Sequence, residues 1–199
     1  MSKKILLYFQ KVDPVMYTAL REIGPFEEIK PRDPREYFSS LCSEIISQQL
    51  SSKAAVPIEQ RCLNLFPRKK VSAKHLLSIP DEKVRGVGTS WAKVSFLKDL
   101  AEKTINKEVP FSKLPNLDDE AVIEELIKVK GIGRWTAEMF LIFSLGRPDV
   151  FSHGDLGLRR AIEKLYKLTD PNQEKIEKIT GKWSPYRSWG SRILWKFID

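Results

Sequence analysis

Residues 126–158, LIKVKGIGRWTAEMFLIFSLGRPDVFSHGDLGL, decide how the chain is interpreted. They predict a helix, a glycine hairpin, a second helix and a loop that ends in one carboxylate. Gly131 and Gly133 flank Ile132, so the backbone can turn tightly with angles that are unfavourable for residues with a Cβ. The amide N–H groups of such a turn lie at the positive end of the next helix, where an anion binds well. We therefore expect a phosphate-binding hairpin, with a plain αα-hairpin and its glycine cap as the alternative.

Three basic residues, Lys128, Lys130 and Arg134, lie next to these glycines. They are expected to add positive charge around the hairpin and so to help it hold a phosphate. The segment that follows, residues 136–145, contains one charged residue, Glu138, and therefore predicts a helix that is buried on almost every side.

A single carboxylate follows the second predicted helix. Gly146 and Pro148 end that helix, and a short connector leads from them to Asp155. Because an amphipathic helix begins directly after Asp155, this residue is expected to cap that helix whatever else it does. The order of the motifs places the carboxylate beside the hairpin.

The same motifs, in the same order, carry a family resemblance. KGIG, WTA, DVF and DLGL, all within residues 130–158, resemble the helix-hairpin-helix (HhH-GPD) DNA glycosylase superfamily, and specifically its 3-methyladenine DNA glycosylase II branch. Three further stretches agree with that branch: residues 45–55 (IISQQLSSKAA), residues 87–93 (VGTSWAK) with the helix FLKDLAEK after them, and residues 183–195 (WSPYRSWGSRILW). The match covers roughly residues 35–199.

The resemblance implies an all-α fold, with two helical lobes and the active-site cleft between them. We expect one compact unit over residues 1–199, with the hairpin and the catalytic loop within residues 118–167 and without a separate N-terminal β domain. Residues 1–12 are expected to form a short strand or an extended arm. Asp13 and Asp33, each followed by proline, predict two helix starts.

The resemblance also implies a mechanism. Cleavage of an N-glycosidic bond builds positive charge on the sugar, and one carboxylate can stabilise that charge and orient the attacking water. Asp155 inherits this catalytic role from the family motif. Trp135 stands where relatives that also cut the DNA backbone have a lysine, and tryptophan cannot form their Schiff base. We therefore expect a monofunctional glycosylase that flips out and excises N-alkylated purines of the 3-methyladenine and 7-methylguanine type, without strand cleavage.

The base pocket is assigned by the same resemblance. N-alkylated purines carry positive charge and can stack on electron-rich rings, which suggests Trp135 and Trp183 as pocket residues. Met139 and Leu156 occupy flanking positions where some members of the family have tyrosines. For either tryptophan, ordinary core packing is the alternative.

A second predicted DNA contact follows the helix that begins near Asp33. Gln48 and Gln49 come where the apolar stripe of this helix ends, and a solvated helix end is one reading of that pair. By resemblance this edge enters the minor groove and fills the hole left by the flipped nucleotide. Gln49 is the first choice for the inserted side chain and Leu50 the second, with Ser51 as a backbone contact.

Gly88 and Ser90 form a further candidate phosphate contact by resemblance. A plain helix N-cap by Thr89 or Ser90 is the alternative.

Composition limits the partners and cofactors. The chain has 34 Lys and Arg against 26 Asp and Glu, a net charge of +8 that favours a polyanion, and we expect double-stranded DNA with damaged bases. Cys42 and Cys62 are the only cysteines, too few for the four-cysteine iron–sulfur cluster of some relatives, so we expect buried reduced thiols and no metal or other cofactor.

The sequence has no pattern of a signal peptide or a membrane span. We expect an intracellular monomer, cytoplasmic in a prokaryote or nuclear in a eukaryote. Two other functions stay open: a glycosylase of the same fold for deaminated or oxidised bases, and a non-catalytic protein that binds damaged DNA.

Overall fold

The computed structural model describes residues 3–198, and within them the secondary structure is entirely helical. This confirms the predicted all-α class. The chain divides into two compact units, unit 1 with Met1–Pro31 and Leu141–Asp199 and unit 2 with Arg32–Phe140. That residues 1–199 act as a single unit stays a prediction. Over the described part of the chain, no helix has the length and apolar character needed to cross a membrane.

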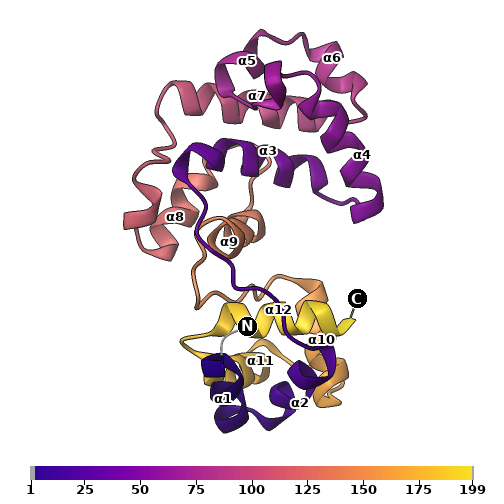
Figure 1. The fold of residues 1–199 in the computed structure, drawn as a ribbon, viewed down its shortest axis with the longest axis vertical. Coiled ribbons are helices and arrows are strands. Elements are labelled where there is room, and N and C mark those ends of the chain that lie inside the picture. The colour runs from indigo at the N-terminus through magenta and orange to yellow at the C-terminus, as the bar shows by residue number, and fades with distance from the viewer. Residues whose placement is uncertain (1–2, 199) are drawn as a thin grey trace. The chain divides into compact units, whose positions relative to one another are not determined.

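Unit 1 is built from both ends of the chain, coloured indigo and orange to yellow in Figure 1. Its helix α12 packs against α2 and α10, and α1 packs against α2. Its core contains Phe9, Met16, Leu158 and Trp183, each fully or almost fully buried. Its helices are α1 (Lys3–Val12), α2 (Pro14–Ile23), α10 (Leu156–Tyr166), α11 (Gln173–Thr180), η4 (Gly181–Trp183) and α12 (Arg187–Ile198).

Helix α1 corrects the expectation of a strand or an extended arm over residues 1–12. Ile5 and Phe9 lie about one helical turn apart, and both are buried in unit 1. In a strand, Leu7 would point to the same side as these two residues, yet it is 52% exposed. The apolar residues therefore follow the helical period. Residues 1 and 2 lie outside the described residues.

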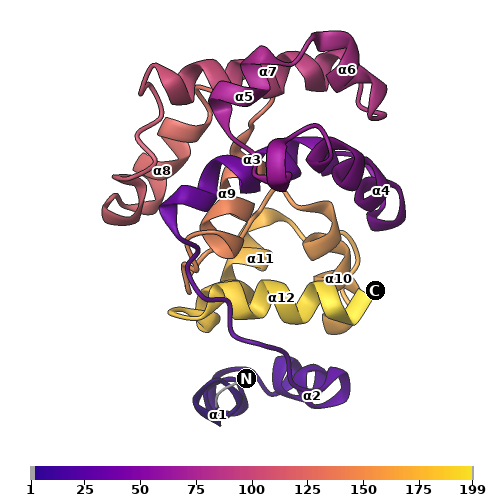
Figure 2. The same cartoon turned by 45° about the horizontal axis from the view of Figure 1, so that its top comes forward.

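Unit 2 is one continuous segment, in which α3 contacts both α4 and α7, and α5 packs on α7 (Figures 1 and 2). Helix α9 (Arg134–Phe143) begins in unit 2, and the boundary between the units falls inside it. The other elements are η1 (Pro34–Glu36), α3 (Tyr37–Ser47), α4 (Ser52–Leu63), η2 (Pro67–Lys69), α5 (Ala73–Ser78), α6 (Asp81–Gly86), α7 (Trp91–Ile105), η3 (Leu114–Asn116) and α8 (Asp119–Leu126).

The helix starts that the sequence predicts have the expected caps. The Asp13 side chain accepts the N–H of Met16 at the start of α2, and Asp155 accepts the N–H of Leu158 at the start of α10. Asp33 caps the short helix η1, which leads directly into α3. Side-chain caps fix where each helix begins and so fix the loops between them.

The two cysteines lie in unit 2 and are buried and free, as expected. Burial raises the pKa of both thiols, that of Cys62 to about 11. They line an apolar cavity of ≈ 160 Å³ between α3, α4 and α7. Raised pKa values keep the thiols protonated and therefore weakly reactive.

Candidate functional site

The glycine hairpin forms between α8 and α9, as the sequence predicts. Gly131 has a φ of +79°, and a Cβ there would lie 2.1 Å from the ring of Phe96 on α7. Both facts require glycine. Gly133 has no heavy atom within 4 Å of an added Cβ and lacks a positive φ. The packing of unit 2 therefore explains Gly131, whereas Gly133 leaves open space beside the backbone.

The three cations beside the hairpin all form ion pairs with acidic side chains, and their contact with a phosphate stays a prediction. The ion pairs are Lys128 with Glu125 at 2.7 Å, Lys130 with Asp99 at 3.7 Å, and Arg134 with Glu138 at 3.1 Å and with Glu120. Arg134 lowers the pKa of Glu120 through its hydrogen bond, so this carboxyl stays ionised. The positive charge beside the hairpin is thus partly balanced, while the start of α9 keeps the positive end of its helix dipole.

Gln48 is tied to the hairpin. Its Nε2 donates to the carbonyl oxygen of Gly131 at 2.8 Å and to Oγ1 of Thr136 at 3.3 Å. A side chain held in this way links the end of α3 to the hairpin, so the solvated-end reading does not describe Gln48. Gln48 and Gly131 are 83 residues apart, so no local sequence pattern could predict this contact.

The residues after Gln48 face solvent. Gln49 is exposed and has a φ of +58°, a left-handed conformation that is unusual for a residue with a Cβ. Leu50 is 37% exposed. Ser51 is exposed at the N-cap position of α4 and makes no side-chain cap bond. Gln49 and Leu50 are therefore both exposed, and insertion of either side chain into DNA stays a prediction.

Ser90 and Gly88 precede α7. Oγ of Ser90 accepts the N–H of Lys93 at 3.2 Å, so the N-cap alternative describes Ser90. Gly88 has a φ of +105°, and a Cβ there would lie 3.0 Å from Nη2 of Arg61. Phosphate contacts by Ser90 and Gly88 stay a prediction.

Asp155 begins α10 in unit 1. It is only 8% exposed, and its Oδ1 accepts the N–H of Leu158 at 2.8 Å. The positive end of the α10 helix dipole lies at this residue. A Cβ on Gly157 would lie 3.0 Å from Oδ1, so the small residue lets the backbone approach the carboxylate closely. The glycine in DLGL is a signal for this contact that the sequence analysis did not use.

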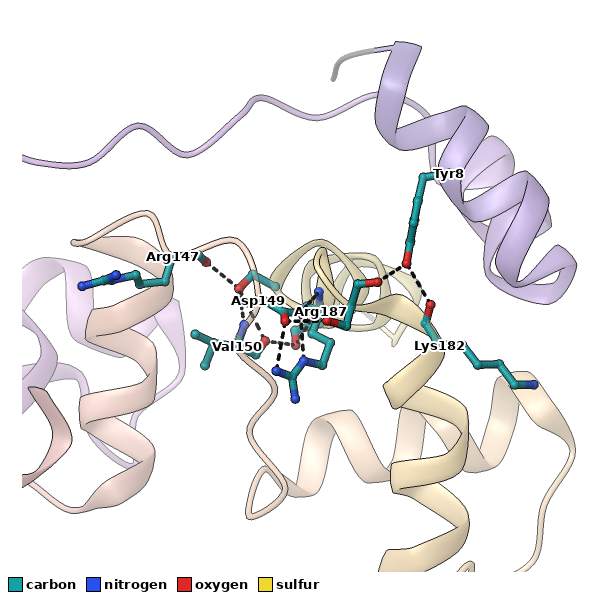
Figure 3. Close-up of polar contacts among 9 residues, drawn as sticks. Tyr8, Arg147, Asp149, Val150, Lys182 and Arg187 are labelled. Atoms are coloured by element: carbon teal, nitrogen blue, oxygen red, sulfur yellow. Dashed lines mark hydrogen bonds and ion pairs between the residues drawn. The ribbon is translucent and has the colours of Figure 1, made fainter. Parts of the chain in front are cut away.

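The loop before Asp155 is bound to the start of α12 by Asp149, a residue that the sequence analysis did not assign to the site. Oδ1 of Asp149 accepts from the N–H of Arg187 at 3.1 Å and from its Nε at 2.8 Å. Oδ2 accepts from Nη2 of Arg187 at 3.0 Å and from Oγ of Ser184 at 2.7 Å. Figure 3 shows the Asp149 and Arg187 side chains facing each other, with Tyr8 reaching the carbonyl of Lys182 nearby.

Ser188 also holds the same loop through hydrogen bonds. Oγ of Ser188 donates to the carbonyl of Arg147 at 2.6 Å and accepts the N–H of Val150 at 2.9 Å. Burial tends to raise the pKa of Asp149, but the hydrogen bonds from Arg187 and Ser184 and the charge of Arg187 outweigh burial, and the pKa lies below the usual value. The loop is thus held by an ionised carboxylate two residues before Phe151.

The four predicted base-pocket residues differ in exposure. Trp135 is 42% exposed at the start of α9, and Leu156 is 68% exposed at the start of α10. Met139 is 4% exposed, and Trp183 has no exposed surface. Ordinary core packing, the alternative for the tryptophans, describes the position of Trp183, and contact of the four residues with a base stays a prediction.

Trp183 is a core side chain with a buried hydrogen bond. Its Nε1 donates to Oδ2 of Asp13 at 2.8 Å, and the same oxygen accepts from the hydroxyl of Tyr166 at 2.5 Å. Its ring packs edge-on against Phe151, with ring centroids 5.9 Å apart, and Phe151 belongs to the loop that leads to Asp155. Trp183 therefore supports this loop from inside unit 1.

Comparisons with known proteins agree with these features. Residues 42–185 match the family described as HhH-GPD superfamily base excision DNA repair protein. DNA-3-methyladenine glycosylase 1 of Schizosaccharomyces pombe is 32% identical over 200 residues, which is 97% of this chain and 86% of the relative. The DNA-3-methyladenine glycosylase of Saccharomyces cerevisiae is 34% identical over 207 residues, which is 85% of this chain and 69% of the relative.

A solved structure shares the fold over nearly the whole chain. The 3-methyladenine DNA glycosylase Mag1 of Schizosaccharomyces pombe, in complex with abasic DNA, superimposes with a TM-score of 0.88 at 31% identity, over 98% of this chain and 96% of Mag1. The matched family region contains the hairpin, Asp155 and the loop that Asp149 fastens. The chain therefore belongs to the HhH-GPD superfamily of base excision DNA repair proteins.

Proposed function

We propose that this protein is a monofunctional DNA glycosylase that flips out N-alkylated purines and hydrolyses their glycosidic bond. The observation that carries the proposal is Asp155, a nearly buried carboxylate held at a helix start within the family motif. The 3-methyladenine glycosylases among its relatives support the substrate class. The partner is double-stranded DNA with damaged bases, bound by a monomer that is cytoplasmic in a prokaryote or nuclear in a eukaryote.

The proposed reaction needs little from the protein beyond Asp155. An N-alkylated purine is cationic and leaves readily, so the carboxylate stabilises the positive sugar and orients water on the opposite face. Trp135 offers an exposed ring on which a cationic base can stack. Because Trp135 stands where lyase relatives have an amine, water attacks the sugar as the bond to the base breaks, so the base is released and the strand stays intact.

The test measures the release of free methylated bases from methylated duplex DNA by wild type and Asp155→Asn. Asparagine caps a helix about as well as aspartate does, so the variant should fold with an unchanged Tm. We expect base release to fall by about 10²-fold or more, because the carboxylate charge and the water contact are lost. Strands should break only after alkali.

Asp118→Asn is the matched control, since Asp118 caps α8 in the same way and lies exposed. It should release bases at the wild-type rate. Nicks before alkali would contradict the monofunctional mechanism. Binding of abasic DNA by the wild type without base release would replace the glycosylase by a damage-binding protein, and release of deaminated or oxidised bases instead would change the substrate class.

A further inference from the structure

Lys93 binds the end of helix α3 from the neighbouring helix α7. Its Nζ donates to the carbonyl oxygens of Ile46 and Gln48, both at 2.7 Å. Helix α3 ends at Ser47, so these carbonyls belong to its last turn and to the residue after it. The last carbonyls of a helix lack intrahelical partners, and a cation is favoured there. Lys93 therefore closes the C-terminus of α3, and burial lowers its pKa.

Gln48 carries this contact on to the hairpin. Its own carbonyl accepts from Lys93, while its side chain donates to the carbonyl of Gly131 and to Thr136. One residue thus joins helix α7, the end of α3 and the glycine hairpin. All three elements lie in unit 2, so the connection does not depend on unit 1.

The conformation of the next residue depends on this connection. Gln49 has a φ of +58°, a left-handed conformation that is unfavourable for a residue with a Cβ. The turn is closed after it, because the N–H of Leu50 donates to the carbonyl of Ser47 at 3.0 Å. Because Lys93 binds the carbonyl oxygens of Ile46 and Gln48, the direction of the backbone is fixed where it turns. The Gln49 side chain is consequently held in solvent, and only its backbone is constrained.

We infer that Lys93 and Gln48 are positioning residues that hold Gln49 at a fixed place relative to the hairpin, so that Gln49 enters the gap left by a flipped nucleotide. The inference rests on the proposed function. Phosphate binding at the hairpin and insertion by Gln49 must occur at the same nucleotide. A rigid link between the hairpin and Gln49 ensures that both contacts can form together. Without the link, the hairpin still grips the backbone but Gln49 no longer reaches the gap in the right orientation.

Helix α7 also supplies a matched control. Lys98 lies on the same helix, and its Nζ donates to the carbonyls of Leu76 at 3.0 Å and Ile79 at 2.6 Å, at the end of α5. It also pairs with Asp81 at 3.1 Å. Lys98 therefore has the charge, the helix and the type of contact of Lys93, but it fastens a helix end that does not lead into the Gln49 turn.

The experiment compares Lys93→Met with Lys98→Met. Fluorescence anisotropy gives the Kd for a duplex with one tetrahydrofuran abasic site and for the same duplex without it, and the ratio of the two Kd values is the preference for the gap. Lys93→Met should lower this preference about tenfold, since a displacement of about 1 Å already disturbs a productive geometry. Lys98→Met should keep it within about twofold, while both variants lower Tm.

Each remaining outcome has a fixed meaning. An unchanged preference in Lys93→Met, or an equal loss in Lys98→Met, overturns the inference and leaves the proposed function intact. A wild type without any preference for the abasic duplex overturns damage recognition itself, and the inference with it. If Lys93→Met fails to fold, Gln48→Met removes the hairpin bond without a change of charge, and the inference then requires the same tenfold loss from that variant.

Discussion

The hairpin of unit 2 and the loop of unit 1 that carries Asp155 both use acidic side chains, but mostly for different contacts. Around the hairpin, carboxylates pair with the cations that flank the glycines. In the loop, Asp149 and Asp155 accept backbone N–H groups at the starts of α12 and α10. The hairpin carboxylates mainly balance charge, although Asp99 also accepts the N–H of Lys130 at 2.8 Å, whereas both loop carboxylates hold backbone in place.

The two regions therefore differ in the interactions that fix their backbone conformations. The hairpin depends on the glycine that packs on Phe96, and the cations of its ion pairs are 50–68% exposed, so these pairs contribute little to stability. The loop depends on hydrogen bonds to partly buried carboxylates, which are stronger than those between neutral groups. Three variants test this difference.

The largest effect is expected from Gly131→Ala. The left-handed φ and the overlap of the new Cβ with Phe96 should together cost about 2–4 kcal/mol in the free energy of unfolding. Gly133→Ala is the matched variant in the same hairpin and should change stability by less than about 1 kcal/mol. Urea denaturation measures both. Equal costs would mean that the hairpin does not depend on the single glycine that packs on Phe96.

An intermediate effect is expected from Asp149→Asn. Loss of the charge weakens the bonds from Arg187 and Ser184, which should lower the free energy of unfolding by about 1–3 kcal/mol at pH 7. In the folded protein the pKa of Asp149 lies below its usual value, whereas in the unfolded chain it is about 3.9. The stabilisation is therefore complete above about pH 4 and declines as the pH falls toward the folded pKa.

Denaturation at pH 7 and at pH 3 checks this second prediction. The difference between wild type and Asp149→Asn should be smaller at pH 3. Asp170→Asn provides the comparison, because Asp170 forms an ion pair with Arg159 but is 89% exposed. It should have little effect at either pH. A pH-independent cost for Asp149→Asn would show that shape, not charge, fastens the loop.

The smallest effect is expected from Glu120→Gln. This variant removes one carboxylate from Arg134 and returns part of a positive charge to the hairpin. Affinity for undamaged duplex DNA should rise about two- to fivefold at low salt. The slope of log K against log salt concentration should become steeper, but by less than the change that one added phosphate contact would cause. Glu124→Gln, on the same helix but outside these ion pairs, controls for the change in net charge. Equal gains from both variants would mean that pairing at the hairpin does not limit DNA binding.

Local patterns predicted the elements of both regions. The caps at Asp13 and Asp155, the hairpin glycines and the apolar run of α9 each depend on residues that are close in sequence, so their meaning could be read directly. The start of the chain shows the limit of such reading. Residues 1–12 are short enough to fit a strand or a helix, and packing inside unit 1 selects the helix.

The site was less predictable because its key contacts join distant residues. Lys130 and Asp99 are 31 residues apart, and Gln48 and Gly131 are 83 apart, so neither pair leaves a pattern in the sequence. The ion pairs of the cations beside the hairpin were therefore not predicted. Trp183 was assigned by resemblance, but no sequence pattern showed that Asp13 binds its indole in the core.

The way unit 1 is assembled from the two ends of the chain affects how the protein is made. The contact between Asp13 and Trp183 spans 170 residues. A ribosome that adds about 5–20 residues per second needs roughly ten to thirty seconds to make the intervening chain. During that time the whole of unit 2 leaves the ribosome while α1 and α2 wait for their partners with apolar faces uncovered. The apolar faces of α1 and α2 are therefore open to aggregation or to a chaperone until α10 and α12 have been made.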